Sequence, residues 1–274
     1  MSGGGGKLFD FRASARAKAR ATRIGGERFL DEAALEGLAH RLSAVTRSFA
    51  HGLLVGDRVP PMLEPFAQKW AIRDFDEREY LDADPGFDLA VSVYSLQAIN
   101  DLPGALIQIR RALKPDGLFL GALFGGGTLG ELRESFMAAE SELLNGASPH
   151  IAPFADIRDL GALLQRAGFA LPVADLERLT VHYSDLRKLL LDLRTHGQTN
   201  TLLARRKNYL GRKMLAALEA HYARRHGRNG KLAATFETLY LTGWAPHENQ
   251  QKPLQPGSAK TRLSDALGTV ERKV

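Results

Sequence analysis

Two apolar runs separated by one amphipathic helix constrain the fold of this chain most strongly. The run FDLAVSVYSL, residues 87–96, has the pattern of a buried strand, and LFLGALF, residues 118–124, has the same pattern. Between them, residues 101–117 have helical periodicity that ends at Pro115 and Gly117. A strand, a helix and a strand joined by short loops form a right-handed crossover between parallel strands. The pattern therefore predicts a parallel α/β sheet with helices on both faces.

The rest of the apolar pattern extends this sheet. Helices are predicted at 29–50, 128–145 and 156–167, strands at 52–55, 70–75, 169–183 and 235–246, and basic helices between the last two strands. We therefore predict a basic segment over 1–28 and a single α/β domain over 29–247. A helical cap, about 184–232, is inserted before the last strand of this domain. The tail, 248–274, is rich in Gln, Pro, Lys and Ser, which predicts loose order.

Composition narrows the classes of protein. The chain has 274 residues, 44% of them hydrophobic, which is enough for a full core. It has no cysteine, which excludes disulfides, thiolate metal sites and cysteine nucleophiles. This suits a reducing compartment, so a cytoplasmic location is expected. No apolar run reaches the roughly 18 to 20 residues that span a bilayer.

The N-terminal segment allows two interpretations. Residues 7–28 are rich in Arg and poor in acids, as in an organellar transit peptide. The same residues also suit a surface helix that turns Phe9, Phe11 and Ile24 inward. The glycine-rich start, Met1–Gly6, is either a tag remnant or a flexible end.

Positive charge is concentrated in the predicted cap. The net charge is +6, and residues 205–231 hold nine Lys or Arg and a single acid, Glu219. Such a face attracts nucleic acid, anionic lipid or an acidic protein. The chain has no nucleic-acid motif and no aromatic residues interleaved with the charges. A solvated helix surface is the alternative interpretation.

The first predicted strand leads into a candidate cofactor loop. The stretch GLLVGDRVPP, residues 52–61, indicates a buried strand, a tight turn and a helix opened by proline. A nucleotide-type cofactor site begins at such a turn. Those loops usually have two or three glycines, which let backbone amides approach the ligand. Here Gly56 stands alone and is followed by Asp57 and Arg58.

Further candidates follow the strand at 87–96. Tyr94, Ser95, Leu96 and Gln97 lie at its carboxyl end, where ligands bind in α/β sheets, although Tyr94 and Leu96 also suit a core. Asp101 suits the N-cap of the next helix. Residues 125–128 form either an anion site or a tight turn. No hydrolase or nucleoside-triphosphatase motif occurs, and the histidines have no metal-ligand spacing.

Several phrases resemble a known superfamily. FDLAVSVYSLQAINDLPGALIQIRRALKPDGLFLGALF, above all LKPDGLFL, resembles class I S-adenosylmethionine-dependent methyltransferases. GGGTLGELR and ATFETLYLTGWAPHENQQKPLQPGSA resemble the methyltransferase-like assembly factors of respiratory complex I. These are relatives of the malonyl carrier-protein methyltransferase of biotin synthesis, and the likeness extends from about Leu8 to Ala259. It implies a seven-stranded Rossmann-like domain that holds S-adenosylmethionine, and a role in maturing the quinone-proximal part of complex I. An arginine hydroxylation on a complex I subunit is attributed to this family.

The chain departs from the family pattern at two places. Family members have a loop resembling DLGCGTG after strand 1, where this chain has LLVGDRV. On the hypothesis that this loop still binds the cofactor, Asp57 would partly replace the family acid that contacts the methionine amino group. Only 30 residues separate Gly56 from Phe87. A βα unit needs roughly 30 residues by itself, so we predict a sheet reduced by one such unit.

The short interval leaves two interpretations of residues 70–75. As strand 2 they would place Asp74 or Asp76 where an acid binds the ribose hydroxyls. As strand 3, which the match of DEREYLDADPGFDL to the family favours, they would place Asp76 near the adenine, and the ribose acid would be deleted.

We therefore predict a methyltransferase-like protein with a degenerate S-adenosylmethionine site, with the cofactor bound weakly or lost, that acts in complex I assembly through a protein partner. The alternative is an active methyltransferase on a protein side chain or a small carboxylic acid. The predicted cofactor residues are Gly56, Asp57, Asp76, Tyr94, Ser95, Leu96 and Gln97. No catalytic residue and no metal ligand is assigned. A sheet edge exposed by a missing strand also predicts a homodimer.

Overall fold

The computed structural model describes residues 6–144 and 146–251. The start of the chain before Gly6 and the predicted loose tail beyond Gln251 therefore lie outside the described residues. The elements are α1 (Phe11–Ile24), α2 (Phe29–Ser43), β1 (Phe49–Val55), η1 (Glu64–Phe66), β2 (Ala67–Arg73), β3 (Phe87–Val93), α3 (Leu102–Ala112), β4 (Leu113–Phe124), α4 (Gly130–Leu144), α5 (Ile157–Arg166), β5 (Ala170–Tyr183), α6 (Leu186–Thr195), α7 (Arg212–His226), β6 (Gly227–Arg228) and β7 (Lys231–Trp244). None of the described helices combines the length and the apolar composition of a membrane-crossing segment.

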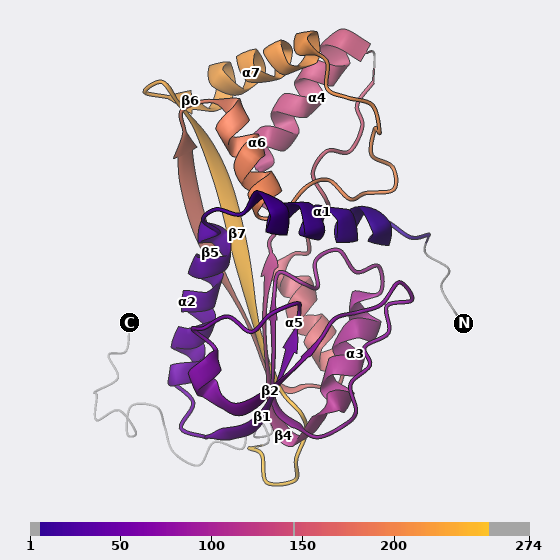
Figure 1. The fold of residues 1–274 in the computed structure, drawn as a ribbon, viewed down its shortest axis with the longest axis vertical. Helices are drawn as coiled ribbons and strands as arrows, with labels where there is room; N and C mark the ends of the chain where they lie inside the picture. The colour runs from indigo at the N-terminus through magenta and orange to yellow at the C-terminus, as the bar shows by residue number, and fades with distance from the viewer. Residues whose placement is uncertain (1–5, 145, 252–274) are drawn as a thin grey trace, which may run out of the picture.

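One mixed sheet of seven strands organises the chain (Figure 1). The order is β2-β1-β3-β4-β7-β5, and β6 pairs with β7. β2, β1, β3 and β4 are parallel, whereas β7 and β5 are antiparallel to their neighbours. The predicted crossover is confirmed, because β3, α3 and β4 form a parallel unit. Asp101 caps α3 by accepting a hydrogen bond from the Gly104 amide at 2.9 Å.

Two apolar layers cover the sheet. α2 packs on one face, where Leu38 and Leu42 are buried against sheet residues such as Leu54 and Val91. α3 and α5 pack on the other face. Burial on both faces explains why β3 and β4 are continuous apolar runs rather than alternating ones. The polar chemistry of the chain must therefore lie at the ends of the strands.

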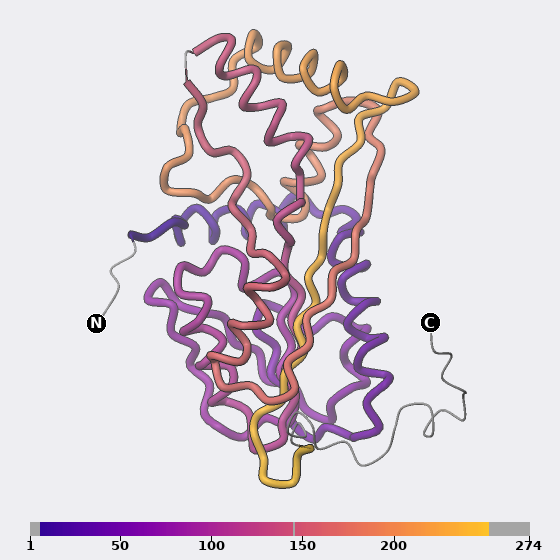
Figure 2. Tube along the Cα trace, turned by 180° about the vertical axis from the view of Figure 1, so that it is seen from behind, coloured from indigo at the N-terminus to yellow at the C-terminus, as the bar shows by residue number. Residues whose placement is uncertain are grey.

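Beyond the parallel strands, β5 and β7 continue as a long ribbon. Each has 14 residues, and residues 232–237 of β7 pair with β5 but not with β4. α4, α6 and α7 gather around this projecting part, and α1 crosses between them and the rest of the sheet (Figure 1). The view from behind shows the same separation (Figure 2). The helices of the cap therefore come from both sides of β5 in the sequence.

The N-terminal segment folds differently from the helix expected there. Phe9 is buried, as predicted, but it precedes α1. Phe11 and Ile24 are exposed, and α1 instead turns Ala17 and Ala21 inward. Small side chains let α1 lie close to α6, which larger inward residues would prevent. The helix predicted over 29–50 ends at Ser43. Phe49, which was counted on its apolar face, belongs instead to β1 and reaches the core from that strand.

β2 lies directly beside β1. Its residues pair in parallel from Phe49 with Ala67 to Val55 with Arg73. The sequence argument favoured a third strand whose inner neighbour is deleted, and the place beside β1 is compatible with that interpretation as well as with a second strand. Only η1 and an irregular turn connect the two strands.

The glycine-rich loop before α4 is bound by an internal carboxylate. The Gly127 amide donates to Glu237 Oε2 at 2.7 Å, and Arg178 Nη2 donates to Glu237 Oε1 at 2.7 Å. The Thr128 hydroxyl accepts a hydrogen bond from the Glu237 amide at 3.0 Å. Of the two interpretations of residues 125–128, the structure shows the turn. The carboxylate that binds the amide of this turn belongs to the protein itself, at Glu237.

We expect Gly127→Ala to destabilise the protein by about 1 to 3 kcal/mol, because a Cβ at this position would overlap the buried Glu237 carboxylate. Gly130→Ala is the matched control, since its Cβ would meet no atom within 4 Å. Urea unfolding of both variants measures the difference. Equal stability of the two variants would contradict this account of the loop.

Candidate functional site

A cleft opens at the carboxyl ends of β1 and β3. Its wide part has a volume of about 580 Å³ and lies between the β1 loop and the start of α2. A narrower extension of about 100 Å³ continues beneath α1 toward the end of α6. Parallel strands place ligand sites at this edge. The cleft is therefore the first candidate for a ligand site.

The structure brings five of the seven predicted cofactor residues to this cleft. Gly56, Asp57 and Ser95 line both parts, and Tyr94 and Gln97 line the narrow part. Leu96 lies away from it, buried in the core beneath α3.

Asp76 also lies away from the cleft, because it shapes a turn after β2. Its carboxylate accepts hydrogen bonds from the Arg78 amide at 2.8 Å and from the Tyr80 amide at 2.9 Å. The acid directly after β2 is Asp74, which pairs with Lys18 of α1 at 2.8 Å. Neither acid lines the cleft.

Tyr94 contributes to the cleft through its backbone more than through its hydroxyl. Its φ is +50°, an unusual value for a residue with a side chain. Its ring stacks on Phe124 at 4.2 Å between centroids, and its hydroxyl is 2.6 Å from that of Thr238. Burial raises the pKa of this phenol. The turn at Tyr94 directs the chain from β3 across the cleft.

Sequence reasoning missed the charged side chains of the cleft wall. Arg28 Nε lies 2.7 Å from Asp31 Oδ2 at the start of α2. Asp31 Oδ1 lies 4.0 Å from Nδ1 of His196, the residue that follows α6. No local pattern relates Arg28 to His196, because 168 positions separate them in the chain.

Burial shifts both of these titratable groups. It raises the pKa of Asp31 to about 6, with Arg28 opposing the shift and Asp57 adding to it. It lowers the pKa of His196 to about 4, and the Arg28 charge adds to that shift. Both groups therefore favour their neutral forms in the folded protein.

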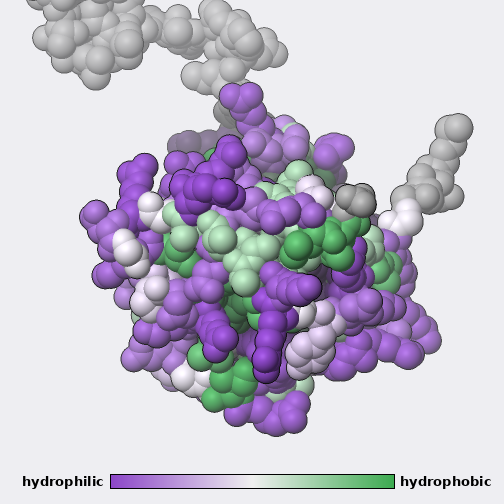
Figure 3. Space-filling view, turned by 90° about the horizontal axis from the view of Figure 1, so that it is seen from above, coloured by the Kyte–Doolittle hydropathy of each residue, from purple (hydrophilic) through white to green (hydrophobic). Residues whose placement is uncertain are grey.

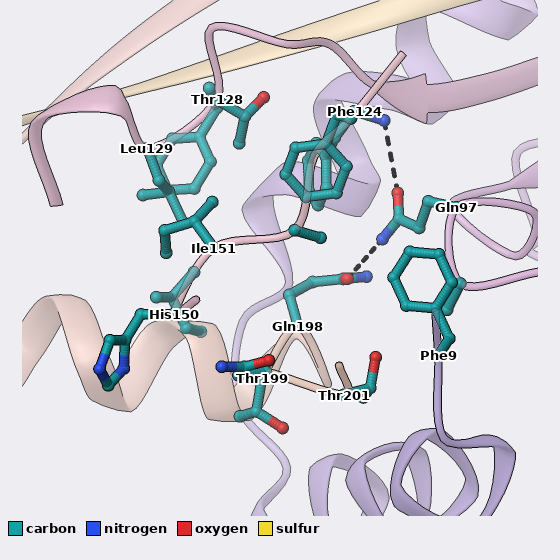
Figure 4. A pocket seen from close by; sticks show the side chains of 16 residues that line it. Phe9, Gln97, Phe124, Thr128, Leu129, His150, Ile151, Gln198, Thr199 and Thr201 are labelled. Carbon is teal, nitrogen blue, oxygen red and sulfur yellow. Dashed lines mark hydrogen bonds between the residues drawn. The ribbon is translucent and has the colours of Figure 1, made fainter. Parts of the chain in front are cut away.

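A second cavity adjoins the narrow part of the cleft. It measures about 60 Å³, and its apolar wall includes Phe9, Phe124, Phe154 and Phe236. Gln97 and Gln198 line both cavities, and their side-chain amides are hydrogen bonded to each other (Figure 4). The Gln97 carbonyl also accepts a hydrogen bond from the Phe124 amide at 3.3 Å. This amide pair separates the charged cleft from the aromatic chamber.

The loop that closes the chamber is held by Glu140 of α4. Its carboxylate binds the Ser148 hydroxyl at 2.9 Å and His150 Nε2 at 2.9 Å. Burial acts to raise the pKa of Glu140, but these hydrogen bonds outweigh it and hold the pKa below its usual value. His150 stacks on Phe136, with 3.7 Å between the ring centroids, and lies at the edge of the chamber (Figure 4). Its Nε2 also lies 3.2 Å from the Ser148 hydroxyl. Because the contacts to Glu140 and Ser148 use the same nitrogen, the cluster positions a loop and is not a nucleophile with its base.

The described residues do not include an assembled set of metal ligands. Among residues 6–144 and 146–251, no three His, Asp or Glu side chains converge on a point that could hold an ion.

Comparison with known proteins identifies a family model and curated relatives. Residues 9–172 match the model described as a methyltransferase domain. The mitochondrial arginine-hydroxylase NDUFAF5 of Dictyostelium discoideum is 45% identical over 188 residues, which cover 68% of this chain and 43% of the relative. Malonyl-acyl-carrier-protein O-methyltransferase of Xylella fastidiosa is 38% identical over 196 residues, which cover 69% of this chain and 64% of the relative. The chain spans about half the length of the NDUFAF5 relatives that it matches, from 43% to 56%.

A solved structure supports the fold. The YcgJ protein of Bacillus subtilis superposes with a TM-score of 0.51 and 13% identity, over 79% of this chain and 99% of that one. At this identity the likeness concerns the fold alone.

The opposite pKa shifts of Asp31 and His196 predict opposite pH dependences. Asp31 binds a proton more tightly when folded, so its contribution to stability falls as the pH rises from about 4 to 6. His196 binds a proton less tightly when folded, so its contribution rises from about pH 4 to 6.5. We expect Asp31→Asn to gain stability relative to wild type over this window, and His196→Gln to lose it. Each difference is at most about 1.4 kcal/mol per pH unit.

Urea unfolding at several pH values, compared with the exposed Asp159→Asn as control, measures both slopes. Parallel pH profiles for all proteins would contradict the assigned shifts.

Proposed function

Because the chain belongs to the methyltransferase domain family, we propose that it is a methyltransferase-like protein that acts in respiratory complex I assembly and binds S-adenosylmethionine weakly. When bound, this cofactor supplies a methyl group on a sulfonium. The observation that carries the proposal is the state of the acid after β2. Asp74 is paired with Lys18 and does not line the cleft, which supports a degenerate site that lacks the family's ribose contact.

The remaining features of the cleft fit the cofactor. A volume of about 580 Å³ suits a nucleoside-sized ligand. Gly56 leaves room, because a Cβ there would meet only Ser95 Oγ at 3.5 Å and the Leu54 side chain. Asp57 would attract the ammonium group and Arg28 the carboxylate of the methionine moiety. The cofactor would therefore be held at its amino-acid end and poorly at its ribose.

We also propose that one βα unit has been lost between β1 and β3. A single strand and a 3₁₀ helix occupy that interval. A complete unit would bring a further strand, helix and turn. The seven strands of the sheet include β6, which has two residues.

A role in assembly is supported by the phrases shared with complex I assembly factors and by the charges of α7. Arg212 and Lys213 lie in the first turn of α7, which contains no acid. The helix dipole disfavours cations there, so these residues do not serve the stability of the helix. From above, over the cap, the surface is largely hydrophilic, with smaller apolar groups between the polar side chains (Figure 3). We infer that the basic side of the cap, defined here by Arg212, Lys213 and Arg228, binds an acidic surface on a partner protein.

An active methyltransferase is the second candidate function. The aromatic chamber favours it, because a second cavity adjoins the cleft, with Gln97 and Gln198 lining both. A protein side chain or a small carboxylic acid is the proposed substrate. The cytoplasmic location and the homodimer stay predictions, and the relatives from D. discoideum and Homo sapiens carry the word mitochondrial in their names.

We expect S-adenosylhomocysteine to bind with a Kd above about 10 µM, or weaker than about −7 kcal/mol, because the ribose contact is missing. Isothermal titration of ligand-free protein measures this value. Gly56→Trp should abolish the heat, since the indole would fill the cleft. Gly211→Trp is the control on an open surface. Retained binding by Gly56→Trp would place the cofactor elsewhere, and nanomolar binding by wild type would refute a degenerate site.

We expect the triple variant Arg212→Glu, Lys213→Glu and Arg228→Glu to lose co-purification of complex I subunits from its own cells without a lower melting temperature. These side chains are exposed, and acids are favoured in the first turn of a helix. Arg205 and Arg206 are unsuitable as positions for charge reversal. Arg205 pairs with Asp10, and Arg206 pairs with the buried Glu140, so their substitution would also remove ion pairs within the protein.

The control reverses Arg111, Arg158 and Arg166 on α3 and α5, which changes the net charge equally. Similar capture by both triple variants would show that the basic side of the cap is not the docking face.

A further inference from the structure

The aromatic chamber is lined almost entirely by side chains that carry no charge. Among the described residues that line it, His150 is the only one that can become charged. Its Nε2 lies 2.9 Å from Glu140 Oε1, so this carboxylate offsets a charge on the ring. Arg206 lies 3.6 Å from the same carboxylate oxygen. A charged group in the chamber would therefore lose its hydration without finding a free counter-ion.

Other charged side chains near the chamber are engaged outside it. The backbone of Glu237 is hydrogen bonded to the Thr128 hydroxyl, but its carboxylate pairs with Arg178 at 2.7 Å. Arg20 donates to the hydroxyl of Thr199 at 2.9 Å and is itself exposed. The chamber consequently suits an uncharged group.

A backbone amide fixes the orientation of two glutamine side chains in the chamber wall. The Phe124 N–H can only donate, so the oxygen of Gln97 faces it, at 3.3 Å. The Gln97 amino group then faces Gln198 and donates to Gln198 Oε1. The Gln198 Nε2 is left without a partner among the described residues, and Figure 4 shows it on the side of the Phe9 ring.

Gln198 therefore presents a donor and an acceptor side by side. Its Nε2 carries two N–H groups, and its Oε1 keeps one lone pair after the bond from Gln97. The matching ligand group has an acceptor and a donor in one plane. A primary carboxamide has both, whereas a carboxylate has only acceptors and a guanidinium has only donors.

The size of the chamber agrees with a group of this kind. Its volume is about 60 Å³. A water-sized group needs roughly 10 to 15 Å³ in this measure, so the chamber has room for about four to six of them. That is enough for a carboxamide and the methylene next to it, but not for a nucleobase. The rings of Phe124 and Phe236 provide apolar walls for its planar faces.

We propose that the aromatic chamber binds a primary carboxamide, of the kind that ends a glutamine or asparagine side chain, through paired hydrogen bonds to Gln198. This assignment rests on the second candidate function, in which the chamber receives the substrate. It narrows that substrate to one with an uncharged amide, and it excludes a carboxylate from the chamber.

Propionamide is the probe, since it reproduces the end of a glutamine side chain. Propionate and N-ethylguanidinium are its matched charged counterparts. The side-chain amide signals of Gln198 in ¹⁵N-glutamine-labelled protein are assigned by their loss in Gln198→Leu. A saturable shift with propionamide, and none with either ion, supports the site. No shift with propionamide, or an equal shift with either ion, overturns it.

Adenine has a similar donor and acceptor edge on a larger ring, so it distinguishes the substrate from the base of the cofactor. We expect no shift of the Gln198 signals with adenine. A saturable shift with adenine, at a concentration where propionamide has no effect, would assign the edge to the cofactor and overturn the carboxamide site.

Two variants test the site through saturation transfer to propionamide, which does not depend on the Gln198 signals. Gln198→Leu is expected to weaken propionamide binding about tenfold or more, because it removes both hydrogen bonds at similar volume. Gln165→Leu on the exposed side of α5 is the control and is expected to bind as wild type does. Retained affinity in Gln198→Leu overturns the proposal.

The second variant is Ala152→Leu, which keeps Gln198 and fills the chamber instead. It is expected to abolish propionamide binding, and it tests the site even if Gln198→Leu does not fold. Unchanged binding by Ala152→Leu at an unchanged melting temperature would place the carboxamide elsewhere and overturn the proposal.

Isothermal titration with S-adenosylhomocysteine separates this site from the proposed function. If S-adenosylhomocysteine binds but propionamide does not, cofactor binding stands and the carboxamide site fails. If propionamide binds and S-adenosylhomocysteine gives no heat, the carboxamide site stands and cofactor binding fails.

Discussion

The parallel pairing of β1 with β3 fixes where ligand chemistry can occur in this molecule. Leu53 lies opposite Ala90 and Leu54 opposite Val91, and all four side chains are buried. Strands covered on both faces have no room for charged groups along their length. The two strands end together, so Gly56 and Ser95 emerge at the same edge. The cleft follows from this shared ending, and α1, α2 and α6 supply its remaining walls.

The sequence predicts the parts that depend on local pattern. The apolar runs give β3, α3 and β4, and the strand-and-turn pattern of residues 52–61 locates the loop that holds Asp57. It does not predict the wall opposite. Arg28 and His196 are 168 positions apart, and each has an ordinary local context at the end of a helix. The place of β2 beside β1 is likewise not given by a local pattern, although β1 is the preceding strand in the chain.

The two ends of the cleft differ in how their titratable side chains are paired. At the end near β2, the available acid is neutralised by Lys18, an exposed pair that contributes little stability. At the end near α6, burial leaves both ring nitrogens of His196 without hydrogen-bond partners among the described residues and raises the pKa of Asp31, which costs free energy in the folded state. The narrow end of the cleft is therefore the costlier of the two ends in the folded state, whereas the pairing near β2 is close to neutral.

The N-terminal segment joins this end of the cleft to the cap. The amides of Leu8 and Phe9 donate to the Asn100 side chain at 2.7 and 2.8 Å, which ties the segment to the turn after β3. Asp10 pairs with Arg205 at 2.9 Å, which ties it to the loop before α7. Phe9 lines the aromatic chamber, and Lys18 lines the narrow cleft. Any displacement of this segment would therefore alter both cavities and the loop before α7 together.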